Sequence, residues 1–274
     1  MVIFQLFSEI RNSLTENPAF EAQQIIMSAA GMNNTEFAFR LKNEVSADIC
    51  IAARKMAKRR IAGEPLQYIV GSAEFMGLTF RVNKNVLIPR ADTETLVEEV
   101  LRLADGRKGD MLDIGTGSGC IGISAAHYNP GLNVTFLDIS AEALKTAEEN
   151  ARINNVCGKF IKADILKETV ADRFDIIVSN PPYIRPDVIE TLQKEVKDYE
   201  PYSALCGGKD GLVFYRHIAE TAPLMLKKDG ILAFEIGYDQ AEEVVRIMHD
   251  FCDVRIIKDL CGNDRVVTGK KAER

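Results

Sequence analysis

The sequence lacks the cysteine and histidine patterns that build metal sites and disulfide frameworks. None of its six cysteines belongs to a CxxC pair, and its three histidines lie far apart, without HxxxH or HExxH spacing. Cysteines scattered in this way are typical of reduced thiols, most of them buried. We therefore expect no structural or catalytic metal ion, and we assign the histidines no catalytic role.

Long apolar runs and an excess of positive charge are missing as well. No uninterrupted apolar stretch approaches the length of a membrane span, and residues 1–9 contain neither a basic n-region nor an apolar h-region. The net charge of -6 argues against a protein that holds long nucleic acid, because such binding draws on clustered Lys and Arg. We expect a cytoplasmic protein with no membrane partner and no stably bound nucleic acid.

The 274 residues divide into three parts by the pattern of their apolar residues. Residues 1–66 have helical spacing, which predicts a small N-terminal helical domain. Residues 67–90 contain short apolar and β-branched runs broken by glycine, which predict a β-hairpin connector. In residues 91–274 strand and helix patterns alternate, as in an α/β fold with a parallel sheet and right-handed crossovers. Residues 254–260 and 265–269 predict a final antiparallel hairpin.

A cluster of basic residues lies near the end of the predicted helical domain: Arg54, Lys55, Lys58, Arg59 and Arg60. One interpretation, which we favour, is a solvent-exposed helix face that the helix dipole helps to stabilise. The other is a docking surface for an acidic or RNA-bearing partner.

A glycine-rich turn follows the first strand predicted in the α/β domain. The apolar run at residues 111–114 leads into Gly115, Thr116, Gly117, Ser118 and Gly119. Glycines at such a turn let backbone amides and a helix N-terminus approach a small ligand, where a Cβ atom would collide. The segment also fits the GxGxxG pattern of dinucleotide-binding proteins, so the turn alone does not identify the ligand.

An acidic residue ends the next predicted strand. Asp138 lies about twenty residues after the glycine turn, where a carboxylate accepts hydrogen bonds from ribose hydroxyls in nucleotide-binding folds. Ser140 then begins a helix as its N-cap. A loop or cap carboxylate is the alternative for Asp138. We favour ribose binding, which indicates an adenosine-containing ligand.

A proline pair follows directly after another apolar strand, residues 174–178, in the order Asn180, Pro181, Pro182, Tyr183. The two prolines end the strand and hold the backbone rigid, without N–H groups of their own. Asn180 Oδ1 and the Pro181 carbonyl are then able to accept both hydrogens of a planar NH2 group, and the Tyr183 ring to pack on it. Such clusters also form plain turns. After this strand we favour a catalytic site.

Methyl transfer to such a nitrogen explains why no base or metal motif is needed. The lone pair of an amide nitrogen is delocalised. Acceptors on both N–H groups return electron density to the nitrogen and stabilise the positive charge that arrives with the methyl group. A thioether leaving group departs neutral, and solvent takes the proton of the methylated nitrogen. Positioning of methyl group and nitrogen supplies most of the rate enhancement.

Together these motifs resemble class I S-adenosylmethionine-dependent methyltransferases and, within them, the release factor glutamine methyltransferases, the HemK or PrmC family. The resemblance runs over nearly the whole chain and includes residues 63–69, 75–78, 87–94, 113–119, 180–184, 200–201 and 204–212. It implies a Rossmann-like seven-stranded sheet behind a helical N-terminal domain that helps to dock the substrate. The implied reaction methylates glutamine N5 in the Gly-Gly-Gln loop of a peptide chain release factor, with S-adenosylhomocysteine as product.

The resemblance also implies roles for single residues. Residues 115–119 would line the methionine portion of S-adenosylmethionine, Asp138 its ribose and Asp164 its adenine. Asn180 would border both the cofactor and the substrate, and residues 180–183 would hold the glutamine amide. Ile165 departs from the family pattern, since some relatives carry an aromatic residue there.

Other functions stay open at this point. Methylation of adenine N6 in DNA would use the same acceptors, but an enzyme that extracts a base from a duplex usually needs a basic groove or a recognition domain. A glutamine methyltransferase that acts on a ribosomal protein would have the same motifs. A dinucleotide-binding dehydrogenase or regulator would fit GxGxxG, but it would leave Asn-Pro-Pro-Tyr without a task.

Overall fold

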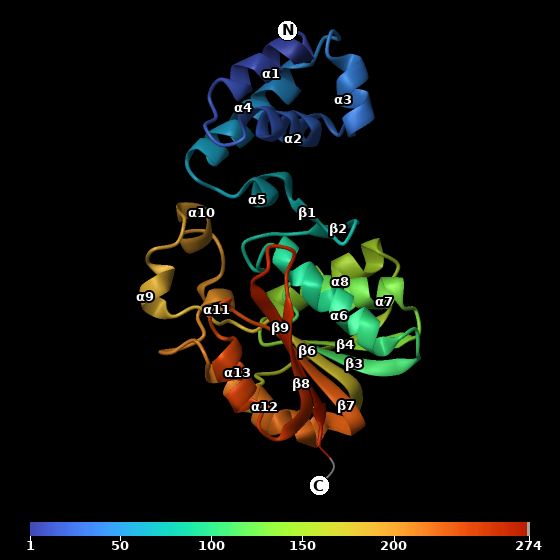
Figure 1. The fold of residues 1–274 in the computed structure, drawn as a ribbon. Coiled ribbons are helices and arrows are strands. Elements are labelled where there is room, and N and C mark those ends of the chain that lie inside the picture. Colours follow the sequence, from blue (N-terminus) through green and yellow to red (C-terminus); the bar gives the residue numbers. More distant parts are fainter. Residues whose placement is uncertain (273–274) are drawn as a thin grey trace. The chain divides into compact units, whose positions relative to one another are not determined.

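The computed structural model describes residues 1–272 and divides the chain into two compact units (Figure 1). The first unit consists of Met1–Ser72 together with Gln193–Tyr199, and the second of Ala73–Leu192 together with the chain from Glu200 onward. The last two residues of the predicted domain 91–274 lie outside the described residues. The first unit therefore contains a short piece of chain that the sequence pattern assigns to the α/β domain.

The first unit is helical, as its apolar spacing predicts. Its helices are α1 (Ile3–Arg11), α2 (Pro18–Ala30), α3 (Asn34–Arg40), α4 (Ala47–Ile61), α5 (Leu66–Val70) and, in the inserted piece, α10 (Lys194–Lys197). Leu6, Ile25 and Ala53 are fully buried in its core. The Ser46 hydroxyl caps α4 by accepting from Ile49 N at 3.4 Å. Residues 67–90 begin with the end of α5 and continue with the strands β1 (Ser72–Phe75) and β2 (Leu78–Arg81), which pair with each other.

Most of the basic cluster on α4 is already paired inside the first unit. Arg54 donates to Glu9 at 2.7 Å and Arg59 to Glu64, and both arginine side chains are about two-fifths exposed, 41% and 40%. Arg60 is different, because only 10% of its side chain is exposed. The cluster thus resembles the solvated helix face that we favour from the sequence more than a free docking surface.

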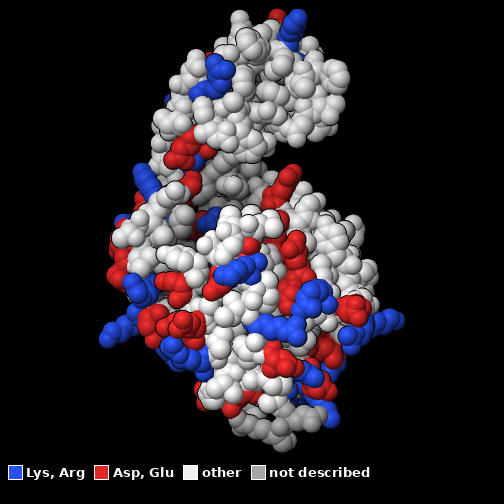
Figure 2. Space-filling view, viewed as in Figure 1, with Lys and Arg blue, Asp and Glu red and all other residues white. Residues whose placement is uncertain are grey.

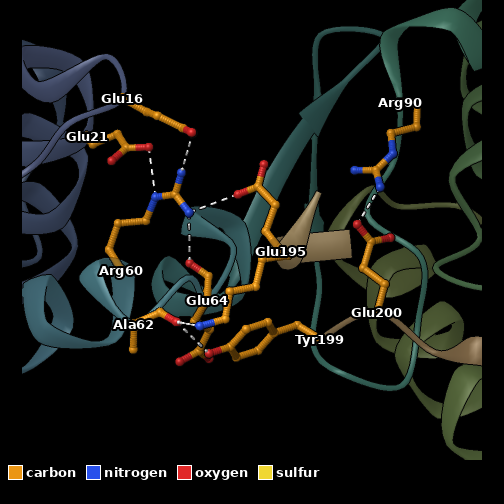
Figure 3. Close-up of polar contacts among 10 residues, drawn as sticks. Glu16, Glu21, Arg60, Ala62, Glu64, Arg90, Glu195, Tyr199 and Glu200 are labelled. Carbon is orange, nitrogen blue, oxygen red and sulfur yellow. Dashed lines mark hydrogen bonds and ion pairs between the residues drawn. The ribbon is translucent and has the colours of Figure 1, made fainter. Parts of the chain in front are cut away.

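Arg60 joins the inserted piece to the rest of the first unit (Figure 3). Its Nε donates to Glu21 at 2.8 Å, its Nη1 to Glu195 at 2.8 Å and its Nη2 to Glu16 at 3.1 Å. These carboxylates come from α2, from α10 and from the loop before α2. We call Arg60, Glu16, Glu21 and Glu195 the Arg60 cluster.

The inserted piece makes two further contacts with the end of α4. Lys194 Nζ donates to the carbonyl oxygen of Ala62 at 2.9 Å. The Tyr199 hydroxyl donates to the same oxygen at 3.3 Å (Figure 3). Gly63 packs on the Lys194 side chain, where a Cβ atom would lie 3.1 Å from Lys194 Cδ. Residues 193–199 are therefore held to the first unit along most of their length.

Replacing Arg60 with alanine should destabilise the first unit by roughly 3 kcal/mol, because buried Glu21 loses its ion-pair partner. Burial, offset in part by the Arg60 hydrogen bond, raises the pKa of Glu21 in the folded protein above its usual value. A carboxyl group whose pKa is higher in the folded than in the unfolded protein stabilises the fold below its unfolded-state pKa. This contribution is lost as the pH rises through the folded-state pKa. The effect of Arg60→Ala should accordingly be larger at about pH 8 than at about pH 5.

Urea unfolding at both pH values measures this difference. Arg54→Ala is the matched control, since the solvent-exposed pair of Arg54 with Glu9 should contribute little to stability. Equal losses for Arg54→Ala and Arg60→Ala would contradict a structural role of the Arg60 cluster.

The second unit contains the predicted α/β fold. Its seven-stranded sheet has the order β5-β4-β3-β6-β7-β9-β8. The strands are β3 (Gly109–Ile114), β4 (Leu132–Asp138), β5 (Gly158–Lys162), β6 (Phe174–Ser179), β7 (Leu226–Glu235), β8 (Phe251–Lys258) and β9 (Asp264–Lys271). Strands β3 to β7 are parallel, and β9 runs antiparallel to both β7 and β8. The seven-stranded sheet and its closing antiparallel hairpin are confirmed.

Helices cover both faces of this sheet (Figure 1). One face carries α6 (Glu94–Ala104), α7 (Cys120–Tyr128) and α8 (Ala141–Ile153), and the other carries α12 (Val213–Met225) and α13 (Ala241–Ile247). Consecutive residues of a strand point to opposite faces. Met111 accordingly packs with α6 and α7, and Leu112 with α12. Burial on both faces explains why the central strands β3 and β6 are mostly apolar in sequence.

The short elements of the second unit lie in its connections. They are the 3-10 helix η1 (Ala91–Thr93), α9 (Pro186–Ile189) and α11 (Tyr202–Leu205). On the face of the second unit displayed in Figure 2, Lys and Arg side chains are interspersed with Asp and Glu. That face therefore has no broad field of positive charge. Within residues 1–272, no helix is both long and apolar enough to cross a membrane.

Candidate active site

The candidate site lies at the carboxyl ends of the central strands. Strand β3 pairs with β4 on one side and with β6 on the other, so the strand order reverses at β3. Open α/β sheets bind ligands in the crevice at such a reversal. A cavity of about 460 Å³ opens there, within the size range of ligand sites. It brings together the predicted residues Gly115, Gly117, Asp138, Asp164, Asn180, Pro181 and Pro182.

The glycine turn presents its backbone to this cavity. Gly115 and Gly117 have positive φ angles, +69° and +56°, and a Cβ atom on either would meet no atom closer than 4.0 Å. That empty space belongs to the cavity. Gly119, in contrast, is packed, because its Cβ would lie 2.7 Å from Ile123 Cδ1. The turn thus fits a ligand that lies against the backbone.

Thr116 and Ser118 are buried behind the turn and do not line the cavity as the described residues form it. The Thr116 hydroxyl donates to Asp113 Oδ2 at 2.7 Å, and Gly122 N donates to the same oxygen at 3.1 Å. Burial raises the pKa of Asp113 to about 6, and these two hydrogen bonds oppose the shift. The buried side chains of Thr116 and Ser118 therefore shape the turn, and only the backbone of these two residues remains available to a ligand.

Asp138 both lines the cavity and orders the turn. Its Oδ2 accepts from Gly117 N at 2.9 Å and its Oδ1 from Ser140 N at 2.8 Å. Burial raises the pKa of Asp138, and the backbone hydrogen bonds oppose the shift. Ser140 caps α8 by accepting from Ala143 N at 3.1 Å, as predicted. The Asp138 side chain thus does two things: it orders the loop, and it lines the cavity.

Asp164 and Ile165, which follow β5, also border the cavity. Asp164 pairs with Lys167 at 2.8 Å, and the Lys167 hydrogen bond lowers its pKa. Ile165 is 6% exposed and packs into the apolar cluster beneath the site. Its aliphatic side chain gives this part of the cavity an apolar wall.

The Asn-Pro-Pro segment follows β6 and reaches the cavity, whereas Tyr183 does not line it as the described residues form it. Tyr183 packs against the apolar cluster of α12 and α13, and burial raises its pKa. Its backbone carbonyl accepts from Gln240 Nε2 at 3.2 Å. Stacking of the Tyr183 ring on a substrate stays a prediction.

Two glycines of the loop between α11 and α12 support this segment. A Cβ on Gly207 would lie 2.6 Å from Tyr183 Cα and 2.7 Å from Pro182 O. A Cβ on Gly211 would lie just as close to the Tyr183 carbonyl oxygen, and Gly211 has a φ of +77°. In addition, Gly207 N donates to Ile184 O at 2.9 Å. The close packing explains the glycines, and no local sequence signal reveals it.

Residues from the connector and from the loop after Tyr199 complete the cavity wall, and the sequence did not identify them: Lys84, Asn85, Val86, Leu87, Pro201, Ser203 and Ala204. Arg90, which lies in the segment 87–94 of the family resemblance, pairs with Glu200, just before this loop (Figure 3). Glu200 is 1% exposed at its side chain. The pair ties residues 88–90 to the start of the loop that carries Pro201.

Comparison with known proteins agrees with the fold and the motifs. The model of the PrmC N-terminal domain matches residues 5–71, and that of the methyltransferase small domain matches residues 91–196. The chain is 42% identical over 265 residues to the release factor glutamine methyltransferase of Fusobacterium nucleatum, covering 93% of this chain and 74% of the relative. It is 47% identical over 214 residues to that of Clostridium botulinum, covering 76% of each.

A solved structure supports the fold of the second unit. The 16S rRNA N2 G1207 methyltransferase of T. thermophilus, solved with AdoMet and guanosine, aligns with a TM-score of 0.53 at 18% identity, over 73% of this chain and 50% of that one. This similarity concerns the Rossmann-like methyltransferase fold alone. The family is shown by the two relatives, which are far more similar in sequence and match most of the chain. The chain therefore belongs to the family of the release factor glutamine methyltransferases.

Proposed function

We propose that this enzyme methylates N5 of the glutamine in the Gly-Gly-Gln loop of peptide chain release factors, with S-adenosylmethionine as the methyl donor. The observation that carries the proposal is one cavity bordered by both the glycine turn and Asn180-Pro181-Pro182. Because translation termination takes place on cytoplasmic ribosomes, we expect the enzyme in the cytoplasm.

The cofactor would occupy the side of the cavity nearest the glycine turn. Residues 115–119 would hold its methionine portion, Asp138 its ribose, and Asp164 with Ile165 its adenine. The open space at Gly115 and Gly117 and the carboxylate of Asp138 fit such a ligand. When bound, S-adenosylmethionine supplies an electrophilic methyl group.

Asn180, Pro181, Pro182 and Tyr183 would bind the glutamine amide. Asn180 Oδ1 and the Pro181 carbonyl accept the two N–H hydrogens, which keeps the nitrogen in line with the methyl donor and stabilises positive charge on it. The hydrogen bond of Tyr183 O with Gln240 and the close packing of Gly207 keep these acceptors in place. Preorganised acceptors are the contribution of this chain to the rate.

Intact-mass and peptide analysis of a release factor incubated with the enzyme and S-adenosylmethionine tests the proposal. We expect one added methyl group, on the glutamine of the Gly-Gly-Gln loop. A release factor with alanine at that glutamine is the control and should stay unmodified. Duplex DNA and ribosomal protein are assayed in parallel, and methylation of either in place of the release factor would overturn the substrate assignment.

A further inference from the structure

Thr93 and Glu235 lie beside Asn180 on its buried side. Ser179 pairs with Phe234 across the parallel strands β6 and β7. Asn180 and Glu235 are the next residues after this pair, so they lie beside each other at the carboxyl ends of the two strands. Thr93 comes from η1, which precedes α6. Thr93 and Glu235 are each 2% exposed, whereas Asn180 reaches the cavity. The two buried side chains therefore stand behind the proposed substrate-binding amide.

The geometry relates the three side chains in one direction. Asn180 Nδ2 donates to Thr93 Oγ1 at 3.3 Å. The Glu235 carboxyl interacts with both Thr93 and Asn180, and within residues 1–272 its Oε2 has no hydrogen-bond partner. A hydroxyl has one hydrogen and two lone pairs, so Thr93 is able to accept from Asn180 and donate to Glu235 at the same time. Thr93 occupies the N-cap position of α6, but within residues 1–272 it makes no side-chain cap with that helix.

This arrangement distinguishes the two possible orientations of the Asn180 carboxamide, which differ by an exchange of Oδ1 and Nδ2. Rotation of the carboxamide by half a turn exchanges its oxygen and nitrogen with little change of shape. In the rotated form Oδ1 would face the Glu235 carboxyl and a lone pair of Thr93, while Nδ2 would face the substrate. Repulsion between acceptors disfavours that form, and two donors would then meet at the substrate nitrogen.

We propose that Thr93 and Glu235 are positioning residues that hold the Asn180 carboxamide with Oδ1 toward the substrate. The inference rests on the proposed function, because it assigns Asn180 to the substrate amide. Neither residue contacts the methyl donor in this scheme. Their contribution is to keep the acceptor in the orientation that the transition state needs.

A purely structural role for Glu235 is the competing explanation. Arg265 is 8% exposed, and its charge acts on Glu235. Arg265 also pairs with Asp92 at 3.0 Å and with Asp259 at 3.2 Å, so it has carboxylate partners without Glu235. Substitutions at Thr93 separate the two explanations, since they leave Glu235 and Arg265 in place.

The main test compares Thr93→Val with Thr93→Ser. Valine keeps the shape of threonine and removes the hydroxyl, and serine keeps the hydroxyl. We expect Thr93→Val to lower kcat about 10- to 100-fold, with the cofactor Kd and the thermal midpoint unchanged. Thr93→Ser should recover most of this loss. Wild-type kcat in Thr93→Val, or an equal loss in Thr93→Ser, would overturn the proposal.

A pH profile tests the contribution of Glu235. Burial raises the pKa of Glu235 to about 7, and its interactions with Thr93, Arg265 and Asn180 oppose the shift. Above this pH the carboxylate accepts from Thr93, whereas the protonated acid becomes a donor that competes with Asn180 for the Thr93 oxygen. The value of kcat should therefore rise with pH through about 7 in the wild type, and the step should be missing in Glu235→Gln.

The other charged or titratable groups that act on Glu235, or on which it acts, come from several elements: Asp92, Cys120, Tyr183, Tyr215 and Arg265. Burial raises the pKa of the thiol and of both phenols, so these three stay neutral across the pH step. Asp113 titrates at about 6 but is unchanged in Glu235→Gln. A wild-type step that persists in Glu235→Gln would contradict the assignment.

Failure of this inference and failure of the proposed function have different signatures. The variants are compared on whichever substrate the wild-type enzyme methylates in the mass-spectrometric assay. A wrong release factor assignment would change that substrate for every form of the enzyme. A wrong positioning role would leave the substrate the same and make Thr93→Val as active as the wild type.

Discussion

Replacing Asn180 with alanine should lower methyl transfer to the release factor by about 100- to 1,000-fold while leaving cofactor binding nearly intact. The substitution removes the proposed acceptor for the substrate amide and the donor to Thr93, but it leaves the glycine turn and Asp138 in place. Single-turnover methyl transfer and a cofactor titration measure the two effects separately.

The control for Asn180→Ala is Asn133→Ala. The Asn133 amide donates to Asp110 at 3.1 Å on the surface, at the amino end of the sheet. Asn133→Ala should transfer methyl groups at the wild-type rate. If Asn180→Ala kept more than about a tenth of wild-type kcat, Asn180 would not be the acceptor that stabilises charge on the nitrogen.

Replacing Gly207 with alanine should lower kcat by roughly 100-fold, since displacement of a positioned group by about 1 Å has effects of that size. The new Cβ would lie 2.6 Å from Tyr183 Cα and 2.7 Å from Pro182 O, and both are backbone atoms. Backbone cannot swing aside as a flexible side chain does, so the Pro182-Tyr183 segment must shift. We also expect a loss of about 1–3 kcal/mol in stability from overpacking.

Gly131→Ala is the matched control for Gly207→Ala. Its Cβ would approach the Asn129 side chain at 3.1 Å, in the turn before β4, at the opposite end of that strand from the cavity-lining Asp138. It should cost some stability and leave kcat unchanged. Stopped-flow or quenched methyl transfer gives kcat, and thermal unfolding gives stability. An active Gly207→Ala would show that the segment tolerates displacement.

The parts of the site that the sequence predicted are short motifs of consecutive residues. The glycine turn, Asp138 and Asn180-Pro181-Pro182 each follow a buried strand, and parallel strands bring their carboxyl ends to one edge. Apolar periodicity similarly predicted the helical first unit and the closing antiparallel hairpin. Local pattern was sufficient because each of these features depends on one strand and the turn that follows it.

The remaining features depend on contacts between distant residues, which no local pattern encodes. Arg60 and Glu195 are separated by 135 positions, and Asn180 and Thr93 by 87. Gly207 is required only because the Tyr183 backbone comes close to it. The packing of the Tyr183 side chain against the apolar cluster of α12 and α13 is another such contact, and stacking of its ring on a substrate stays a prediction.

The assignment of residues 193–199 to the first unit affects how family members can be recombined. The chain passes between the units at residues 72–73, 192–193 and 199–200, so the first unit is discontinuous in sequence. A chimera that exchanges only the N-terminal 72 residues would bring a foreign α4 to this chain's own Glu195 and Lys194. A chimera that carries residues 193–199 as well would keep the Arg60 cluster and the Ala62 contacts within one parent. In evolutionary terms, the two segments are expected to be inherited together.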